Sequence, residues 1–452
     1  MTTLVVEQAE VGGRVVDVAI RGHRIAAVGE RLAIAGPVER LPARGGALLP
    51  GLHDHHVHLL AMAAALASID VAGAADLAAI GRSHRNRPPG DWLRVVGYHE
   101  SDHGPLDRYL LDQLAPGRPV RVQHQTGVMW VLSSAALDAI GLAAHPTGRL
   151  IGEDDRLQHL VPPPPLDLGA VGAQLAAFGV TGVTDATPSR DLSDVELIAA
   201  AVGDGRLPQH LVVTGAPDLA LRASPWPGVD LGPVKVVLAD HALPALDELI
   251  AAFAGARRLG RTVAVHCVTR ASLVLAVVAW QEAGAVAGDR IEHGSVVPPE
   301  LAAAIADLGL TVVTQPSFIR DRGDRYLRDV DPEDRPHLYP CGRLQAGGIA
   351  VAGSTDAPFG DPDPWRAIAS AVDRRTRAGA VLGPEEGVSP RRALELFLGA
   401  PDRPGGPPRG VAPGARADLC LLDAPLADVL AAPSADRVAA TVIGGSVVWI
   451  RR

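Results

Sequence analysis

The stretch LHDHHVHL at residues 52–59, which follows a Pro-Gly pair, decides how the rest of this chain is interpreted. It reads as a short β-strand, and side chains alternate across a strand, so Asp54, His56 and His58 share one face. Two imidazoles at positions i and i+2 of a strand can chelate one divalent metal ion. Asp54 could orient a ligand from behind. A chance His-rich turn remains the alternative for the motif taken alone.

Further short apolar or β-branched runs follow, most of them separated by Ala/Leu-rich segments of helical character. Alternating strands and helices are typical of a parallel sheet, and eight such units predict an α/β fold, a (β/α)₈ TIM barrel. The eight candidate strands are 52–59, 179–186, 209–215, 233–239, 262–268, 290–295, 311–317 and 349–355.

Both ends of the chain consist instead of short β segments separated by turn residues. We therefore expect residues 1–50 and 405–452 to form one small β-sandwich domain, and residues 51–404 to form the metal-binding barrel. The first two barrel strands are too far apart for a single helix. This spacing predicts an inserted segment at about 72–165, ending in a linker at the proline run 162–165.

Composition excludes several classes of function. The 452-residue chain has a formal charge of −9 and no Lys/Arg run, so we expect no nucleic-acid partner. It shows no signal-peptide pattern and no apolar run of about 18 residues, so we expect no membrane partner. Its three cysteines are far apart, which fits a reducing cytoplasm.

Other metal-binding residue types lie at or near the ends of other candidate strands. His266 ends one strand, His293 ends another, and Asp356 follows a third. The C-terminal strand ends of a (β/α)₈ barrel converge on one mouth. A lone histidine on a β run is usually a structural core residue, but several ligand types at several strand ends favour one metal site.

Lys235 is the only lysine in the sequence, against 42 lysines and arginines in total. A buried lysine is costly and usually shifts its pKa or finds a partner. One role that needs an amine is reaction with CO₂ to give N6-carboxylysine, which can bridge two metals. An ordinary structural lysine, or one paired with a carboxylate, remains open.

Asp356 follows the last candidate strand, where it would lie close to a metal-bound water. Zinc can lower the pKa of such a water to about 7. The carboxylate could then take the proton and pass it to a leaving nitrogen, which makes Asp356 a candidate general base and acid. An aspartate that only caps a helix is the alternative.

Several of these motifs together resemble the amidohydrolase superfamily of metal-dependent hydrolases, and most closely its amidohydrolase-3 (YtcJ-like) group. The resemblance extends over nearly the whole chain. It is carried by LLPGLHDHHVHL (48–59), RPVRVQHQTGVMWVLSSAAL (118–137), GVTGVTDA (179–186), VKVV (234–237), VAVHC (263–267), RIEHGS (290–295), VAGSTDAPFGDP (351–362) and GVAPGARADLCLLDAPL (410–426).

The resemblance implies an enzyme that hydrolyses a C–N bond, an amide or cyclic amide other than a peptide, through a metal-activated hydroxide. It implies one or two divalent metals per chain, usually zinc, and a small-molecule substrate. Asp356 would be the general acid/base, and His293 would position substrate or bind the second metal. A deaminase of a nitrogen heterocycle and a non-catalytic scaffold are the alternatives, and a homodimer is left open. The implied metal ligands are His56, His58, Lys235, His266, His293 and Asp356.

The chain also departs from the group's pattern, mainly where a substrate would bind. Gly127-Val128 and Ser133 stand where the group commonly has Gly-His and Asn, and Ala239-Asp240-His241 replaces a glycine-rich stretch. We expect the charged segment 321–331 to be a mobile lid or a solvated loop. The candidate substrate contacts are His124, Trp130, Gln315, Arg320 and Tyr326.

Overall fold

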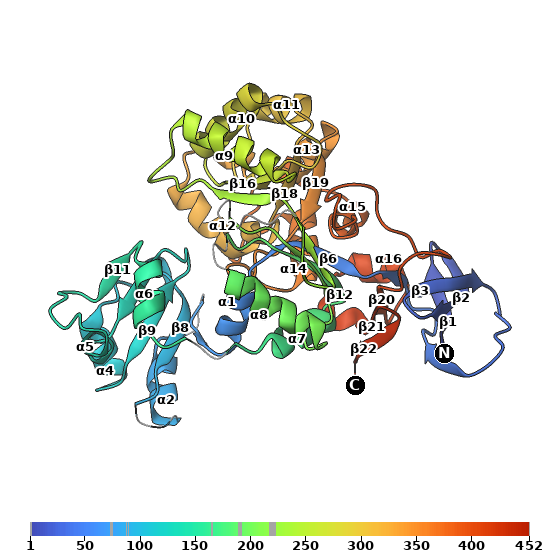
Figure 1. Ribbon diagram of the computed structural model, residues 1–452, viewed down its shortest axis with the longest axis horizontal. Coiled ribbons are helices and arrows are strands. Elements are labelled where there is room, and N and C mark those ends of the chain that lie inside the picture. The colour runs from blue at the N-terminus through green and yellow to red at the C-terminus, as the bar shows by residue number, and fades with distance from the viewer. Residues whose placement is uncertain are drawn as a thin grey trace. The chain divides into compact units, whose positions relative to one another are not determined.

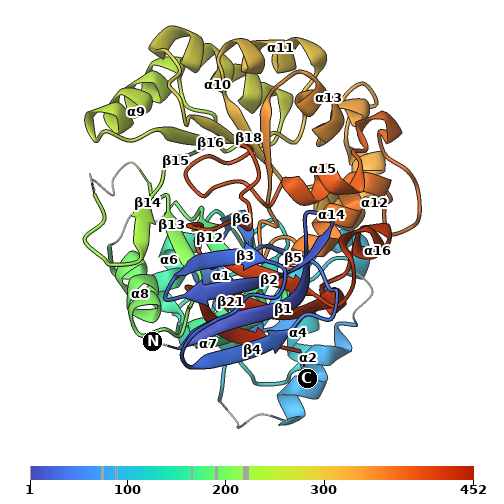
Figure 2. The same cartoon turned by 90° about the vertical axis from the view of Figure 1, so that its right-hand side faces the viewer.

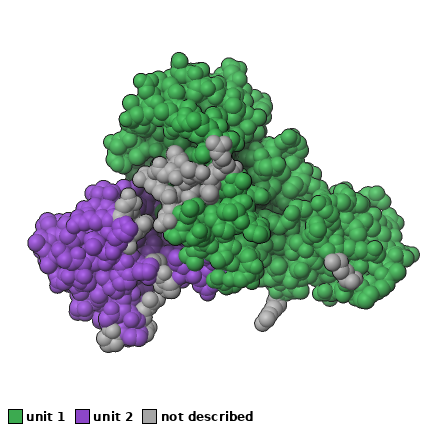
Figure 3. All heavy atoms as spheres, in the orientation of Figure 1, with its two compact units in different colours: residues 1–59, 171–452 green, residues 60–170 purple. Residues whose placement is uncertain are grey.

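The computed structural model describes residues 2–72, 76–86, 88, 90–163, 166–188, 192–216 and 223–451, so Pro164 and Pro165 of the predicted linker lie outside the described residues. The chain divides into two compact units, coloured separately in Figure 3. The first contains residues 1–59 and 171–452, and the second contains residues 60–170.

The first unit holds two sheets of parallel strands (Figures 1 and 2). One has the order β14-β13-β12-β6 and the other β15-β16-β17-β18-β19. Each predicted strand contains one of these strands, and β14 is an additional one. Their bounds are β6 Leu52–Val57, β12 Val180–Asp185, β13 His210–Val213, β14 Val229–Leu231, β15 Val234–Val237, β16 Val263–Cys267, β17 Arg290–His293, β18 Thr311–Thr314 and β19 Ala350–Gly353.

Backbone hydrogen bonds join the two sheets at both of their edges. At one edge, the Lys235 amide of β15 donates to the Gly215 carbonyl beyond β13, over 2.8 Å. At the other, the Asp356 amide donates to the His56 carbonyl, and the His58 amide to the Ala357 carbonyl, each over 2.9 Å. The residues after β19 are therefore held beside the end of β6.

Helices follow most of these strands, and α9, α10 and α11 lie along one face of the five-stranded sheet (Figures 1 and 2). Trp280 of α10 is fully buried there and its ring Nε1 donates to Asp289 over 3.0 Å. The helices are α8 Leu192–Gly203, α9 Leu246–Arg258, α10 Arg270–Ala283, α11 Pro299–Asp307, α12 Ser317–Asp329, α13 Cys341–Ala346, α14 Pro364–Asp373 and α15 Pro390–Glu395; α7 Leu168–Ala177 precedes β12.

The two chain ends build two four-stranded sheets, β3-β2-β1-β4 and β22-β21-β20-β5. The second sheet mixes the ends, because β5 pairs antiparallel with β20. Both sheets contribute to one apolar core, in which Val6 and Ile20 pack with Leu421 and Val442. The bounds are β1 Thr3–Val11, β2 Arg14–Arg21, β3 Arg24–Gly29, β4 Val38–Pro42, β5 Leu48–Pro50, β20 Leu419–Leu422, α16 Leu426–Ala431, β21 Val438–Ile443 and β22 Ser446–Ile450.

The second unit has its own five-stranded sheet, β11-β10-β9-β8-β7, and its own apolar core around Val95, Tyr98, Leu111 and Val122. It covers the region predicted as an insertion. The bounds are α1 Leu59–Leu66, β7 Ile69–Asp70, α2 Ala78–Asn86, β8 Leu93–Tyr98, α3 Glu100–His103, α4 Arg108–Leu114, β9 Val120–His124, β10 Met129–Leu132, α5 Ser134–Ala139, β11 Arg149–Ile151 and α6 Asp154–Leu160.

The prediction of a solvated loop at 321–331 is wrong, because most of this segment belongs to helix α12; that the segment is a mobile lid stays a prediction. Phe318, Ile319 and Gly323 are buried at helical spacing, and Tyr326 and Leu327 pack on the same apolar cluster. A Cβ on Gly323 would come within 2.6 Å of the Thr376 side chain, so the helix packs closely there. The many charges of the segment hide this amphipathic pattern.

Two expectations from composition can be compared with the structure. Cys267, Cys341 and Cys420 are all buried free thiols. Among the described residues, no helix combines the length and the apolar character needed to cross a membrane.

Candidate metal centre

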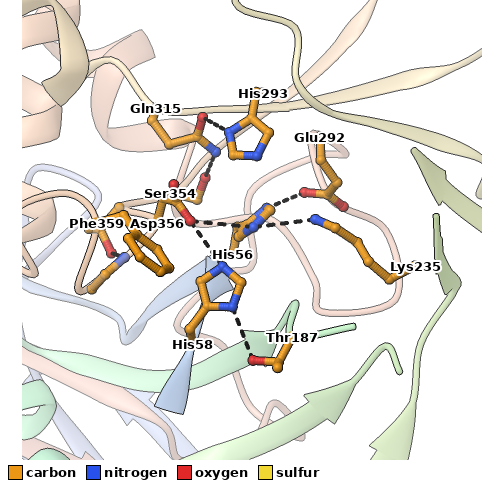
Figure 4. A network of polar contacts seen from close by, with 12 residues as sticks. His56, His58, Thr187, Lys235, Glu292, His293, Gln315, Ser354, Asp356 and Phe359 are labelled. Atoms are coloured by element: carbon orange, nitrogen blue, oxygen red, sulfur yellow. Dashed lines mark hydrogen bonds and ion pairs between the residues drawn. The ribbon is translucent and has the colours of Figure 1, made fainter. Parts of the chain in front are cut away.

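His56 near the end of strand β6 and His58 just after it lie in the centre shown in Figure 4, and every residue of the strand is buried. The Nε2 atom of His56 lies 3.5 Å from Asp356 Oδ1 and 3.4 Å from Lys235 Nζ. The Nε2 atom of His58 lies 3.1 Å from the same Asp356 oxygen. Two imidazole nitrogens thus converge on one carboxylate.

The opposite nitrogens of both rings are held by partners behind them. His56 Nδ1 lies 2.5 Å from Glu292 Oε2, and an ionised carboxylate only accepts, so Nδ1 carries the proton and Nε2 keeps its lone pair. His58 Nδ1 lies 3.0 Å from the Thr187 hydroxyl, which can accept or donate and so serves either tautomer. A metal-binding histidine is usually oriented in this way.

His293, the last residue of β17, is oriented by a chain of three hydrogen bonds. The Gln315 amide nitrogen donates to Ser354 Oγ over 2.9 Å, and that hydroxyl donates to the Thr314 carbonyl over 3.1 Å. This fixes the Gln315 amide with its oxygen toward His293, 2.8 Å from Nδ1. His293 therefore carries its proton on Nδ1, and its Nε2 is free to bind a metal.

Two of the central residues adopt left-handed backbone conformations. The φ angle is 69° at His293 and 57° at Asp356, a region that residues with a Cβ rarely occupy. At His293 the left-handed turn ends the regular alternation of β17. His293 and the neighbouring Glu292 can therefore both contribute to one centre, although adjacent residues of a regular strand face opposite sides.

Burial and charge set the protonation states of the ligand types. Burial lowers the pKa of His56 and His293, and lowers that of His266 to about 3, so these imidazoles are neutral. Burial alone would raise the pKa of Asp356, but the His58 hydrogen bond and the neighbouring histidines outweigh it and hold the pKa below its usual range. The centre therefore offers neutral nitrogens and an ionised carboxylate.

Lys235 is 3% exposed, and burial lowers the pKa of its amine, although Glu292 and Asp356 oppose that shift. Glu292 is fully buried, which would raise its pKa, but Arg290, His56 and Lys235 outweigh burial and hold the pKa well below its usual range. The Arg290 Nε atom donates to Glu292 Oε1 over 2.6 Å. Glu292 thus connects an arginine on one side with the centre on the other.

Asp54 acts on the backbone rather than on an imidazole. Its Oδ1 accepts from the His56 amide over 3.2 Å, and its two oxygens accept from the Thr355 amide and hydroxyl. Burial raises the pKa of Asp54 to about 7, against the opposing effect of these hydrogen bonds. The carboxylate ties the segment before Asp356 to β6.

Two of the six proposed ligands, His58 and Asp356, lie just beyond the C-terminal ends of parallel strands; His56, His266 and His293 lie in the C-terminal halves of theirs, and Lys235 is the second residue of β15. The side-chain donors of His56, His58 and Asp356 all lie within 4.8 Å of one another. The ring of His293 lies 4.9 Å from that of His56 and 4.4 Å from that of His266, measured between centroids. Lys235 contacts this group at His56, whose Nε2 lies 3.4 Å from Lys235 Nζ.

The five candidate substrate contacts are divided between the two units. Gln315 is buried behind His293, Arg320 is exposed on α12, and the Tyr326 hydroxyl lies 3.2 Å from that of Tyr339. His124 and Trp130 belong to the second unit. There His124 Nε2 lies 2.9 Å from Glu100, and Trp130 stacks near Arg94 and Arg121.

Sequence reasoning missed Glu292 and Thr187, which hold the Nδ1 atoms of His56 and His58. Thr187 follows the second strand by two residues, and strand-end position was a signal available for it. Glu292 directly precedes His293, and strict strand alternation would turn it away from the centre. Its proximity to a predicted ligand was therefore a weak signal.

The donor set fits a divalent metal. Neutral imidazole and carboxylate are ligands of Zn²⁺ and similar ions, and a carboxylate behind a histidine is the usual supporting partner. The decisive observation is that His56 Nε2 points at Asp356 while its Nδ1 is fixed by Glu292.

Comparison with known proteins identifies the family of this chain. Residues 42–449 match the family described as "Amidohydrolase family". An N-substituted formamide deformylase from Arthrobacter pascens is 26% identical over 90% of this chain and 89% of its own length. A putative amidohydrolase, YtcJ, from Bacillus subtilis is 25% identical over 75% of each chain.

Among solved structures, an uncharacterized metal-dependent hydrolase from Pyrococcus horikoshii superposes with a TM-score of 0.74. It is 18% identical, and the match covers 94% of this chain and 96% of the other. That likeness concerns the fold. The family match spans most of the sequence and confirms the resemblance carried by its motifs: this chain belongs to the amidohydrolase family, in the amidohydrolase-3 (YtcJ-like) group.

Proposed function

We propose that this chain is a metal-dependent enzyme that hydrolyses a C–N bond of a small amide or cyclic amide. One observation carries the proposal: the Nε2 atoms of His56 and His58 converge on the ionised Asp356 while their Nδ1 atoms are held by protein partners. A divalent cation bound between these groups would balance the carboxylate and accept the lone pair of His56 Nε2, and that of His58 Nε2 in the tautomer protonated at Nδ1.

A bound divalent ion, zinc in our proposal, supplies a nucleophile from water at neutral pH and polarises the substrate carbonyl. His56, His58, Lys235, His266, His293 and Asp356 would hold one or two such ions. Asp356, ionised at neutral pH, accepts a proton at Oδ1 or Oδ2 and returns it to the leaving nitrogen. The backbone hydrogen bond from the Asp356 amide to the His56 carbonyl holds this carboxylate beside His58.

The substrate class is proposed to include N-substituted formamides, because one relative of similar length carries that name. The proposed architecture is a (β/α)₈ barrel made of the two parallel sheets of the first unit, with residues 1–50 and 405–452 forming a β-sandwich. The backbone hydrogen bonds that join both sheet edges support closure of the barrel. The shared apolar core of the chain ends supports the sandwich.

Lys235 is proposed to react with CO₂, so that its amine nitrogen bonds to carbon and releases one proton. The resulting carbamate would provide oxygens for a second metal. Deep burial of the amine and its 3.4 Å approach to His56 Nε2 support this role. If Lys235 is carboxylated, we expect two metals per chain and, after labelling with isotopic bicarbonate, a carbonyl signal from the carbamate. One metal and an unmodified amine would overturn it.

The function is tested with the purified, metal-loaded chain on a panel of N-alkyl formamides, N-acyl amino acids, cyclic ureides and lactams. Release of an amine and a carboxylic acid or formate supports the proposal. Release of ammonia from a nitrogen heterocycle instead would establish the deaminase alternative. If the panel gives no turnover while the centre holds metal, or if His58→Asn leaves a detected turnover unchanged, the assignment of this centre as a hydrolase site is wrong.

A further inference from the structure

One face of the sheet in the second unit carries two arginines side by side. Arg94 of β8 and Arg121 of β9 are directly opposite each other in the parallel pairing of these two strands. Like charges at directly opposite positions of neighbouring strands repel each other and destabilise a sheet. The pair is therefore unfavourable unless a group of opposite charge lies beside it.

Trp130 of β10 is an aromatic neighbour of both arginines. The guanidinium carbons of Arg94 and Arg121 lie 5.6 and 5.7 Å from the centroid of its ring. Trp130 is directly opposite Gln123 of β9, which follows Arg121 by two residues, so all four side chains share one face of the sheet. An aromatic ring attracts cations but carries no net charge, so it holds the two guanidinium groups near each other without neutralising them.

Among the described residues, no carboxylate lies within ion-pair distance of either guanidinium group. Arg94 donates to Ser68 Oγ over 2.8 Å and to Gln123 Oε1 over 2.7 Å, and both of these partners are neutral. Asp70 of β7 lies on the same face, but it is exposed and its Oδ1 accepts from a backbone amide. Burial and the charge of Arg121 lower the pKa of Arg94 only to about 10, so Arg94 stays charged at neutral pH.

Two side chains of β9 have donors that a ligand can reach. Arg121 is partly exposed and makes no hydrogen bond with the described residues; its Nε is buried, whereas Nη1 and Nη2 are accessible. Gln123 is also partly exposed, and because its Oε1 accepts from Arg94, its Nε2 remains as a donor. The place where the two arginines meet thus combines positive charge with unused N–H donors.

We propose that Arg94, Arg121 and Gln123 form a binding site for a small dianion, either a dicarboxylate or a phosphate. Two guanidinium groups without carboxylate partners carry two positive charges, which a dianion would balance. The planar donors of arginine match the oxygens of carboxylates and phosphates in pairs. The site lies wholly within the second unit, and its occupation does not depend on hydrolysis at the metal centre.

Binding of the dianion is expected to stabilise the second unit. The ligand would remove the repulsion between Arg94 and Arg121, and it would contact two neighbouring strands of the five-stranded sheet. A ligand that binds the folded chain but not the unfolded chain raises the free energy of unfolding by mass action. The melting temperature of the enzyme should therefore rise with the concentration of the dianion.

The test measures binding of succinate and, separately, of inorganic phosphate to the metal-loaded enzyme by titration calorimetry. Arg121→Met keeps an aliphatic side chain beside Trp130 but removes the charge and the donors. Gln123→Glu keeps an acceptor for the hydrogen bond from β8 and places a carboxylate beside both arginines. Arg85→Met and Gln113→Glu are matched controls, because both residues are exposed on helices of the second unit.

Saturable binding of at least one of the two anions to the unchanged enzyme is expected, weakened about tenfold or more by either variant of the site and by neither control. Tighter binding of succinate would identify the ligand as a dicarboxylate, and tighter binding of phosphate would identify it as a phosphate. Without any ligand, Gln123→Glu should also raise the melting temperature, because its carboxylate would neutralise the pair.

Binding that both Arg121→Met and Gln123→Glu retain would place the anion elsewhere, such as at the metal, and would overturn the site. The absence of saturable binding of either anion would overturn it as well. If Arg121→Met does not fold, Gln123→Glu still decides, since it keeps the hydrogen bond to Arg94. A melting temperature of Gln123→Glu that does not rise would show that the two arginines need no counterion, which also contradicts the proposal.

Discussion

At their C-terminal ends, the parallel strands of the first unit carry imidazoles and carboxylates; at their N-terminal ends they carry arginines. In the first region Asp356 and Glu292 are ionised, whereas in the second region Arg261 donates to main-chain carbonyls and Asp418 pairs with Arg416. Strand β17 reaches both regions, because Arg290 is its first residue and Glu292, which supports His56, lies two residues later. The comparison teaches that two residues on one face of a four-residue strand can connect the two ends of the parallel strands.

The largest effect is expected from Asp356→Asn, which removes the proposed proton acceptor of the candidate metal centre but keeps its shape. We expect kcat/KM to fall about a thousandfold, within the range for loss of a general acid/base. Steady-state kinetics on the best substrate of the panel would measure it. Asp329→Asn, at an exposed position of α12, is the control. A loss of less than tenfold in Asp356→Asn would remove this residue from the chemistry.

Glu292→Gln tests the link between the two regions. It leaves His56 Nδ1 without its carboxylate and Arg290 without its partner. We expect metal affinity to fall about 10- to 100-fold, as for other carboxylates that support a metal-binding histidine. Competition with a chelator measures the affinity, and Glu300→Gln, exposed on α11, is the control. Unchanged metal affinity would show that His56 binds metal without the hydrogen bond from its Nδ1 to Glu292.

Gln315 provides a test with a built-in rescue. Gln315→Leu removes the oxygen that fixes the proton of His293 on Nδ1, whereas Gln315→Glu keeps an acceptor at that place. We expect metal affinity to fall about tenfold in the first variant and to be largely retained in the second. Equal losses in both would mean that Gln315 fills space rather than orients the ring.

The smallest effect is expected at the opposite strand ends, where Asp418 pairs with His210 and Arg416. Burial would raise its pKa, but these hydrogen bonds outweigh it and lower the pKa to about 2. A carboxyl with a lowered folded-state pKa stabilises the fold above its unfolded pKa of about 3.8, and loses this contribution as pH falls toward about 2. Discounting for solvent leaves about 1 kcal/mol.

Asp418→Asn should therefore lower the free energy of unfolding at pH 6, with the difference from the unchanged chain shrinking below about pH 4. Urea unfolding at several pH values measures it. Asp402 is exposed and lines the same cavity as Asp418, so Asp402→Asn is the control and should change the free energy of unfolding little. A difference that stays constant down to pH 2 would mean that the pairing contributes nothing to the pH dependence.

Most of the strand pattern could be predicted from the sequence, because apolar runs bounded by turn residues mark buried parallel strands well. Strand β14 was missed since Val229–Leu231 offers only three residues of such a pattern. Helix α12 was missed because its charged residues outnumber the buried ones. Short strands and strongly charged amphipathic helices carry weak periodic signals, and tertiary packing decides them.

The residues of the metal centre were easier to predict than their partners. His56, His58 and Asp356 follow directly from strand-end position and residue type. Glu292 was missed because alternation along β17 breaks at the left-handed backbone of His293. Gln315 was singled out for contact with substrate, whereas its amide lies behind His293, and only side-chain geometry reveals that orientation.

The left-handed backbone at His293 and Asp356 has a consequence for protein engineering. A residue with a Cβ is less stable in this conformation than glycine by about 1–2 kcal/mol. A selection for thermal stability alone, without a demand for turnover, would therefore favour glycine at both positions. The most thermostable variants from such a selection would then have lost two residues of the candidate metal centre. Mutagenesis for stability should therefore leave His293 and Asp356 unchanged.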